Sequence, residues 1–223
     1  MTVSTDGREL ADLLDGLVGE PVGGDPAGPA DRVLLGISGA PGSGKSTLAA
    51  ALAALRPEAA VVPLDGFHLA DVELARRGLL DRKGAPESFD GHGYAALLTR
   101  LRERPDHVVM APGFERDLEQ PLAGALPVPP SAGLVVTEGN YLLLDADPWP
   151  QARARLDAVW HVVVDDALRR TRLVARHEAF GKPPAAARAW VDRVDEPNAR
   201  LVEAARDRAD LVLDLTGWRP VGG

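Results

Sequence analysis

The sequence predicts an α/β fold, with a doubly wound, mainly parallel sheet, helices on both faces and a phosphate-binding loop at one edge. A glycine-rich run over residues 39–47 follows a short apolar run and precedes an Ala/Leu-rich segment. Further short apolar runs alternate with helical patterns, which is typical of parallel sheets. The 223 residues are 45% hydrophobic and 26% charged, as expected of one compact globular domain.

The N-terminal region should precede the core of the domain. Leu10, Leu13, Leu14 and Leu17 recur at helical spacing, which predicts an amphipathic helix before the core. The Gly- and Pro-rich stretch Pro21–Asp31 predicts a linker. We therefore expect a single domain over residues 1–223, with the helix and linker in residues 1–30 and the core in residues 32–215.

Short apolar runs predict the strands of the core, several of them buried on both faces. The predicted strands are Arg32–Ile37, Ala60–Leu64, His107–Met110, Leu134–Thr137, Val159–Val164 and Leu211–Leu215. The predicted helices are Lys45–Leu55, Leu69–Arg77, Tyr94–Arg104, Asp166–Ala179 and Pro184–Arg193. Pro197 should break the later helical stretch, with a final helix starting near Asp195 or Glu196 and running through Arg206. The Pro-rich stretch from Gln120 to Ser131 predicts a loop.

The glycine-rich run fits the pattern of a loop that wraps nucleotide phosphates. Its glycines let backbone N–H groups approach the phosphates, and the following helix N-terminus adds about half a positive charge. Lys45 should bridge the outer phosphates, and the Ser46 hydroxyl should hold Mg²⁺. The residues expected to bind ATP through this loop are Gly39, Ala40, Pro41, Gly42, Ser43, Gly44, Lys45, Ser46 and Thr47.

Two acidic residues directly follow predicted strands. Asp65 ends the run Val61-Val62-Pro63-Leu64, and Glu138 ends the run Leu134–Thr137. Ligands of doubly wound sheets bind at the carboxyl ends of the strands, where the phosphate loop also lies. A carboxylate there can deprotonate an attacking hydroxyl or support Mg²⁺. Capping of a turn or helix is the alternative role for both residues.

Several motifs appear in the order typical of one kinase family. They are the phosphate loop, Asp65-Gly66-Phe67-His68, the segments Arg82–Asp90 and Glu138–Leu144, and Arg172–His177. Together they resemble the uridine kinase, phosphoribulokinase and pantothenate kinase family over about residues 32–215, and most of all its nucleoside/nucleotide kinase-like branch, which includes proteins labelled fructose transport system kinases. The resemblance implies a P-loop NTPase fold and an ATP- and Mg²⁺-dependent kinase that phosphorylates a hydroxyl of a nucleoside, sugar or pantothenate-like acceptor. It also implies Asp65 as the base and Glu138 near the metal.

Three arginines lie on one face of the predicted helix 166–179. Arg169, Arg172 and Arg176 are three and four residues apart, so they can close over ATP and offset charge on the transferred phosphoryl group. We expect ATP contacts from Arg169 and Arg172, and catalytic roles for Arg172 and Arg176 as part of a lid at about residues 166–193. The alternative is a solvated basic stripe that pairs with acidic neighbours such as Glu178.

The resemblance also indicates where the phosphate acceptor should bind. The candidates are His68, Arg82, Phe89, Phe114, Arg116, Asn140, Tyr141 and His177, beside Asp65 and Glu138. Core packing for the aromatic side chains and solvent exposure for Arg82 are the alternatives. The segment Phe114–Glu119 departs from the uridine kinase pattern and weakens the case for uridine or cytidine. The four tryptophans, which include Trp190 and Trp218, show no stacking pattern and are interpreted as core or interface residues.

Composition and the motifs that are absent argue against several other classes of protein. The net charge of −8 argues against a nucleic-acid partner, and the absence of cysteine excludes thiolate catalysis and disulfides. No apolar run reaches membrane-spanning length and no leader pattern is present, so a cytoplasmic protein without a membrane partner is expected. A regulatory GTPase would need an Asn-Lys-x-Asp element, which the chain lacks. A nucleoside-monophosphate kinase, a non-catalytic nucleotide-binding module and a homodimer all remain open.

Overall fold

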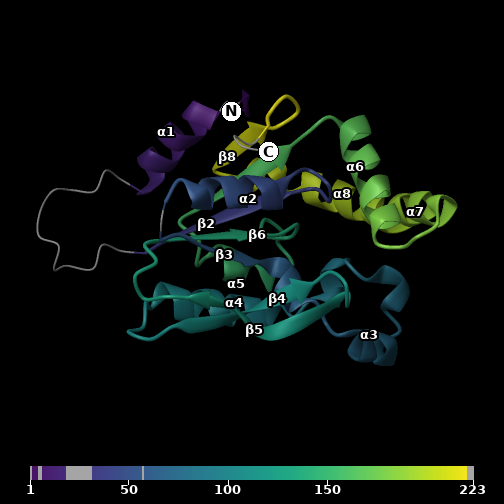
Figure 1. Ribbon diagram of the computed structural model, residues 1–223, viewed down its shortest axis with the longest axis horizontal. Helices are drawn as coiled ribbons and strands as arrows, with labels where there is room; N and C mark the ends of the chain where they lie inside the picture. Colours follow the sequence, from purple (N-terminus) through teal and green to yellow (C-terminus); the bar gives the residue numbers. More distant parts are fainter. Residues whose placement is uncertain (1, 5–6, 19–31, 57, 220–223) are drawn as a thin grey trace, which may run out of the picture.

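A parallel sheet forms the centre of the computed structural model, which describes residues 2–4, 7–18, 32–56 and 58–219 (Figure 1). Its six strands lie in the order β1-β8-β7-β2-β6-β3, and every pairing is parallel. The strands are β1 (Thr2–Ser4), β2 (Val33–Gly39), β3 (Ala60–Pro63), β6 (Leu134–Glu138), β7 (Ala158–Val163) and β8 (Leu211–Asp214). The predicted parallel sheet is confirmed, although β1 was not anticipated. The predicted linker Pro21–Asp31 lies outside the described residues.

Helices cover both faces of the sheet because successive strand residues point to opposite sides. In β2, Leu35 packs in the core beneath α1 (Gly7–Val18) and α2 (Lys45–Ala54). Its neighbour Leu34 packs in the opposite core, with α4 (Gly91–Arg102), α5 (Trp149–Arg153) and α8 (Glu196–Glu203). The doubly wound arrangement follows from strands that are apolar on both faces.

The remaining helices gather at one end of the sheet. Figure 1 shows α6 (Asp166–Ala179) and α7 (Pro184–Trp190) there, with α3 (Asp71–Arg77) below them. The bounds of α6 and the C-terminal end of α3 agree with the prediction. Short 3₁₀ turns complete the chain: η1 (Leu64–Phe67), η2 (Leu80–Arg82), η3 (Pro86–Ser88) and η5 (Arg206–Arg208). No helix in the described ranges is both long and apolar enough to cross a membrane.

The prediction of a loop from Gln120 to Ser131 is wrong. Most of it forms β5 (Gln120–Val128), which pairs antiparallel with β4 (Val109–Glu115) in a separate two-stranded sheet. Prolines are tolerated at the edges of sheets, and a two-stranded sheet consists only of edges. An irregularity between Ala111 and Gly113 lets β4 continue past the predicted end at Met110.

Pro197 does not break the helical stretch as predicted. The chain passes from α7 through a π-helical segment, η4 (Val191–Asp195), directly into α8. The wider turn of a π-helix accommodates a proline ring and its missing N–H donor, so the chain stays helical. The predicted start near Glu196 is confirmed for α8, but this helix ends at Glu203, before Arg206.

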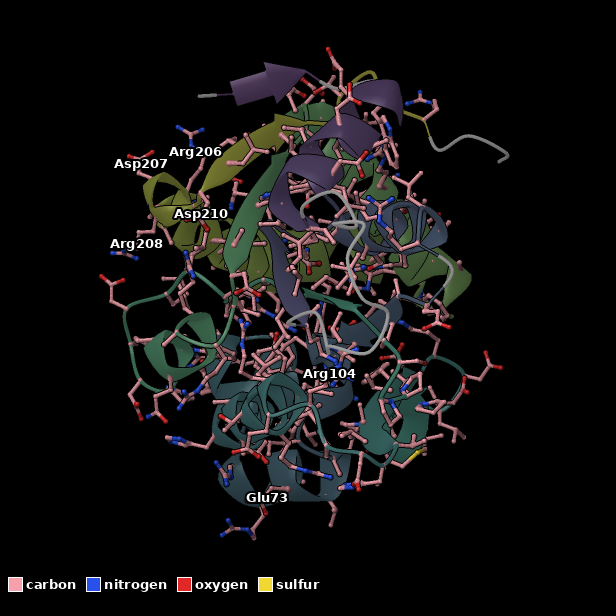
Figure 2. The ribbon with its side chains drawn as sticks, turned by 90° about the vertical axis from the view of Figure 1, so that its left-hand side faces the viewer. Glu73, Arg104, Arg206, Asp207, Arg208 and Asp210 are labelled. Carbon is pink, nitrogen blue, oxygen red and sulfur yellow. The ribbon has the colours of Figure 1, made fainter. Side chains whose placement is uncertain are left out.

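Charged residues at the amino ends of the strands hold the sheet together. The Asp157 carboxylate accepts the Leu34 N–H at 2.8 Å, and the Asp210 carboxylate accepts the Val159 N–H at 2.6 Å. Asp210 also pairs with Arg153 at 2.8 Å. Figure 2 shows Asp210 close to Arg206 and Arg208 at this edge. These side chains therefore serve the fold at the edge opposite to the phosphate loop.

Arg32 is a buried cation whose role the sequence did not reveal. Its guanidinium donates to the carbonyls of Ala132, Leu101 and Pro129 at 2.8, 2.9 and 2.9 Å, and only 3% of the residue is exposed. Burial, followed by the nearby Arg104, lowers the pKa of this group. It therefore connects the start of β2 to the end of α4 and to the loop before β6.

We expect Arg32→Met to lower the free energy of unfolding by about 2–4 kcal/mol, because the buried carbonyls lose charged donors. Urea denaturation followed by circular dichroism measures the change. Arg56→Met is the control, since Arg56 pairs with Asp15 at the surface and should cost less than about 1 kcal/mol. Equal small effects in both variants would contradict this role for Arg32.

Candidate active site

The phosphate loop connects β2 to α2 and packs against α6. Gly42 and Gly44 adopt positive φ angles of 78° and 98°, which glycine reaches without strain. A Cβ atom on Gly42 would lie 2.8 Å from the Leu173 side chain and 3.0 Å from the Arg169 carbonyl. The loop therefore lies against α6 with no room for a side chain at this position.

Glu138 ends β6 at the carboxyl edge of the sheet. It is in register with Ile37 of β2 and Pro63 of β3, so it lies between the phosphate loop and η1. The Ser46 hydroxyl donates to Glu138 Oε1 at 2.8 Å. Asp65 lies in η1, directly after β3. The parallel strands thus bring both predicted carboxylates to the phosphate loop.

A cavity of about 380 Å³ contains both carboxylates, and we call it the carboxylate cavity. Lys45, Ser46, Asp65 and Glu138 line one end of it. The Lys45 ammonium donates to the Ala40 carbonyl at 3.0 Å and is largely buried. Burial lowers the pKa of Lys45 to about 8, against the opposing influence of Glu138 and Asp65. Anionic phosphates would stabilise its charged form.

The two carboxylates have pKa values shifted in opposite directions. Burial and the negative charge of Asp65 raise the pKa of Glu138, although Lys45 and the Ser46 hydroxyl oppose this. Burial disfavours the charge of Asp65 too, but His68 and Arg116 outweigh it and lower the pKa of Asp65. Burial lowers the pKa of His68, although the charge of Asp65 opposes this. Arg116, 2.5 Å from Asp65 Oδ2, and the ammonium of Lys45 both favour the ionised form of Asp65.

A second cavity of about 350 Å³, which we call the loop cavity, lies on the other side of the phosphate loop. Gly42 to Thr47 line it together with Arg172, Arg176, Trp218 and Arg219. Arg176 lines the carboxylate cavity as well. Within the described part of the chain, no carboxylate forms an ion pair with Arg172 or Arg176. Both guanidinium groups are therefore available to an anionic ligand.

Arg169, which was grouped with Arg172 and Arg176, contacts the phosphate loop through the Pro41 carbonyl, 3.5 Å from its Nη1. It lines neither cavity, and only 3% of the residue is exposed. Its guanidinium pairs with Asp166 at 3.0 Å and with Glu196 of α8 at 2.6 Å. Packing turns this part of α6 toward α8, so Arg169 holds the two helices together in the structure.

Most candidate acceptor residues line the carboxylate cavity. They are His68, Phe89, Phe114, Arg116, Asn140 and His177. Arg82 and Tyr141 are not among the lining residues. The exposed Arg82 pairs with Glu87, and the buried Tyr141 hydroxyl donates to the Gly84 carbonyl. His177 binds Asp195 at 2.7 Å, which joins α6 to η4.

Two lysines and two tryptophans are among the cavity residues that sequence reasoning missed. Lys83, Lys182 and Trp190 line the carboxylate cavity, and Trp218 lines the loop cavity. Both tryptophans were interpreted as core or interface residues; Trp218 does pack against the core beneath α1 and α2, and it also lines a cavity, as Trp190 does. Trp218 Nε1 is buried without a hydrogen-bond partner among the described residues. The rarity of lysine in this arginine-rich chain was the one available signal.

Comparison with known proteins finds relatives that are named kinases. No protein-family model matches the sequence. A Schizosaccharomyces pombe protein provisionally named a uridine kinase is 33% identical over 194 residues, which cover 82% of this chain and 83% of that protein. A pantothenate kinase of Mycolicibacterium vanbaalenii is 33% identical, with 88% of this chain and 68% of that protein covered.

A solved structure shares most of the fold. The crystal structure of a protein from Silicibacter sp. TM1040, provisionally named a fructose transport system kinase, is 43% identical to this chain. The match covers 91% of this chain and 98% of that one, with a TM-score of 0.79. The sheet and the phosphate loop described above therefore belong to an arrangement found in another solved protein.

Proposed function

Because the chain belongs to the uridine kinase, phosphoribulokinase and pantothenate kinase family of P-loop kinases, we propose that it transfers the γ-phosphoryl group of ATP to a hydroxyl of a nucleoside, sugar or pantothenate-like acceptor. ATP-dependent phosphorylation of a small molecule follows from membership of this family. The acceptor class, the role of each residue, the use of Mg²⁺ and the assignment of the chain to one kinase domain are parts of the proposal.

One observation carries the proposal: Asp65 and Glu138 line the same cavity as Lys45 and Ser46 of the phosphate loop. A hydroxyl group needs a base to accept its proton during phosphoryl transfer, and the base must lie beside the outermost phosphate. The surrounding cations lower the pKa of Asp65, which lines the cavity together with Lys45, so we assign the role of base to its carboxylate.

The other residues at this edge suit binding and charge compensation. Lys45 would hold the outer phosphates, and Arg172 and Arg176 would offset the charge of the transferred group. Ser46 and Glu138 offer neighbouring oxygen ligands, 2.8 Å apart, of the type that Mg²⁺ prefers. When bound there, Mg²⁺ would neutralise charge on the phosphates. The lid proposed for residues 166–193 would exclude water, and its contact with Gly42 couples it to the phosphate loop.

A screen of acceptors tests the function. We expect ADP release from Mg·ATP to rise on addition of one hydroxyl compound from a panel of nucleosides, pantothenate, ribulose 5-phosphate and simple sugars. A coupled enzyme assay measures ADP, with Lys45→Ala as the blank, because this variant loses the phosphate-binding ammonium. Identification of the phosphorylated product by mass spectrometry shows which hydroxyl reacted. ATP binding without stimulated release by any compound of the panel would count against the proposed acceptor classes.

A further inference from the structure

The lysines of this chain are concentrated at one cavity. Lysine and arginine together number 25, but only Lys45, Lys83 and Lys182 are lysines, and all of them line the carboxylate cavity. Lys45 belongs to the phosphate loop, whereas Lys83 follows η2 and Lys182 lies between α6 and α7. Figure 1 shows these two segments at the same end of the sheet, near α3 below and α7 above. Neither lysine is needed for the phosphates of ATP if Lys45, Arg172 and Arg176 bind them.

Lys83 and Arg116 surround one aromatic ring beside Asp65. The Lys83 ammonium lies 5.7 Å from the centroid of the Phe114 ring, and the Arg116 guanidinium carbon lies 4.8 Å from it. The His68 ring packs 4.9 Å from the same ring. Two cations therefore meet at the wall of the cavity that adjoins the proposed base, beside the His68 imidazole, whose Nδ1 donates to the Asp65 carbonyl at 2.8 Å.

The counter-charges of these cations are incomplete or required elsewhere. Lys83 donates to the Glu119 carbonyl at 2.5 Å and to the Asp71 carboxylate at 2.7 Å, but 47% of the Asp71 side chain is exposed, against 16% for Lys83. Arg116 pairs with Asp65, which must also receive the acceptor hydroxyl. Lys182 lies 4.7 Å from the centroid of the Trp190 ring, and no carboxylate of the described residues forms an ion pair with it. Withdrawing a lysine from water while its partner faces solvent is costly, which favours a ligand-binding role.

We propose that the phosphate acceptor is an anionic hydroxy compound, a carboxylate or a phosphate ester, whose negative group binds between Lys83 and Arg116 while its hydroxyl reaches Asp65. This inference rests on the proposed kinase function and specifies its acceptor. Lys182 and Trp190 line the same cavity, where Lys182 would add positive charge when the acceptor is bound.

Matched pairs of compounds test the proposal by binding. The anionic probes are pantothenate, gluconate and ribulose 5-phosphate, and their neutral counterparts are pantothenol, glucose and ribulose. Thermal shift and calorimetry are carried out with Mg²⁺ and a non-hydrolysable ATP analogue present, so that the phosphate loop is occupied. We expect at least one anionic probe to bind and its neutral counterpart to bind at least about 10-fold more weakly. The carboxylate and phosphate probes distinguish the two sources of charge.

Variants of the cavity residues then test where the anionic group of the probe binds. Lys83→Met should weaken binding of the anionic probe by about 10-fold to 100-fold, and Lys83→Arg should restore most of it. Arg206→Met is the matched control, because it removes one charge from the remote surface turn labelled in Figure 2. The thermal midpoint of each ligand-free variant checks that it is folded. Equal binding of neutral and anionic probes, no binding of any anionic probe, or an unchanged affinity in Lys83→Met would overturn the proposal.

The same probes separate this inference from the proposed function. Anionic probes that bind through Lys83 but stimulate no ADP release would support the anion site and contradict phosphorylation of those compounds. A neutral compound that is phosphorylated while its anionic counterpart is not would support the kinase function and overturn the anionic acceptor.

Discussion

Replacement of Asp65 by asparagine is expected to lower kcat by about 10²–10⁴-fold, the usual contribution of a general base. Asparagine keeps the size of the side chain but cannot accept the hydroxyl proton. The variant also leaves Arg116 without its carboxylate partner, while Lys45 and Ser46 remain in place. Affinity for Mg·ATP should therefore change little compared with turnover.

Steady-state kinetics with the acceptor identified in the screen measures kcat, and calorimetry measures the affinity for the ATP analogue. Asp117→Asn is the matched control, since this exposed carboxylate lies next to Arg116 in sequence but lines neither the carboxylate cavity nor the loop cavity. Near-normal turnover in Asp65→Asn would refute the assignment of Asp65 as the base. A loss that appears only in ATP affinity would point to a role in nucleotide binding instead.

Arginine replacements in α6 should separate catalysis from stability. We expect Arg176→Ala to lower kcat by about 10²–10³-fold, because Arg176 lines both cavities, forms no ion pair with the described residues, and is proposed to offset charge on the transferred phosphoryl group. Arg169→Ala should instead lower the free energy of unfolding by about 1–3 kcal/mol, since it removes a buried guanidinium and leaves Glu196 with Arg170, at 3.1 Å, as its remaining partner.

Urea denaturation and kinetics on the same two proteins distinguish these outcomes. The assignment of Arg176 requires a large loss of kcat at an almost unchanged unfolding free energy. The assignment of Arg169 requires the reverse, provided that activity is measured well below the denaturation midpoint. A large loss of kcat in folded Arg169→Ala would instead support the contact between Arg169 and ATP that the sequence predicts.

Local sequence patterns were sufficient for the parts of the fold that depend on neighbouring residues. The Asp166–Ala179 helix was predicted with its observed bounds because its periodicity lies within one short segment. The edge position of Asp65 and Glu138 was also predictable, since parallel strands that follow a phosphate loop place their carboxyl ends together. The β4–β5 sheet was missed, because Pro121 and Pro127 imitate a loop unless the strand is known to be an edge.

The sequence by itself determined the phosphate loop, the alternation of strands and helices, and the two carboxylates, because each depends on a short run of residues with a defined spacing. Only the tertiary structure decided which arginines of α6 line the cavities beside the phosphate loop, because the rotation of a helix is set by its packing against α8 and the phosphate loop. It also brought Lys83 and Lys182, which are far apart in sequence, to one cavity. Such convergence depends on how distant segments pack, and no local pattern records it.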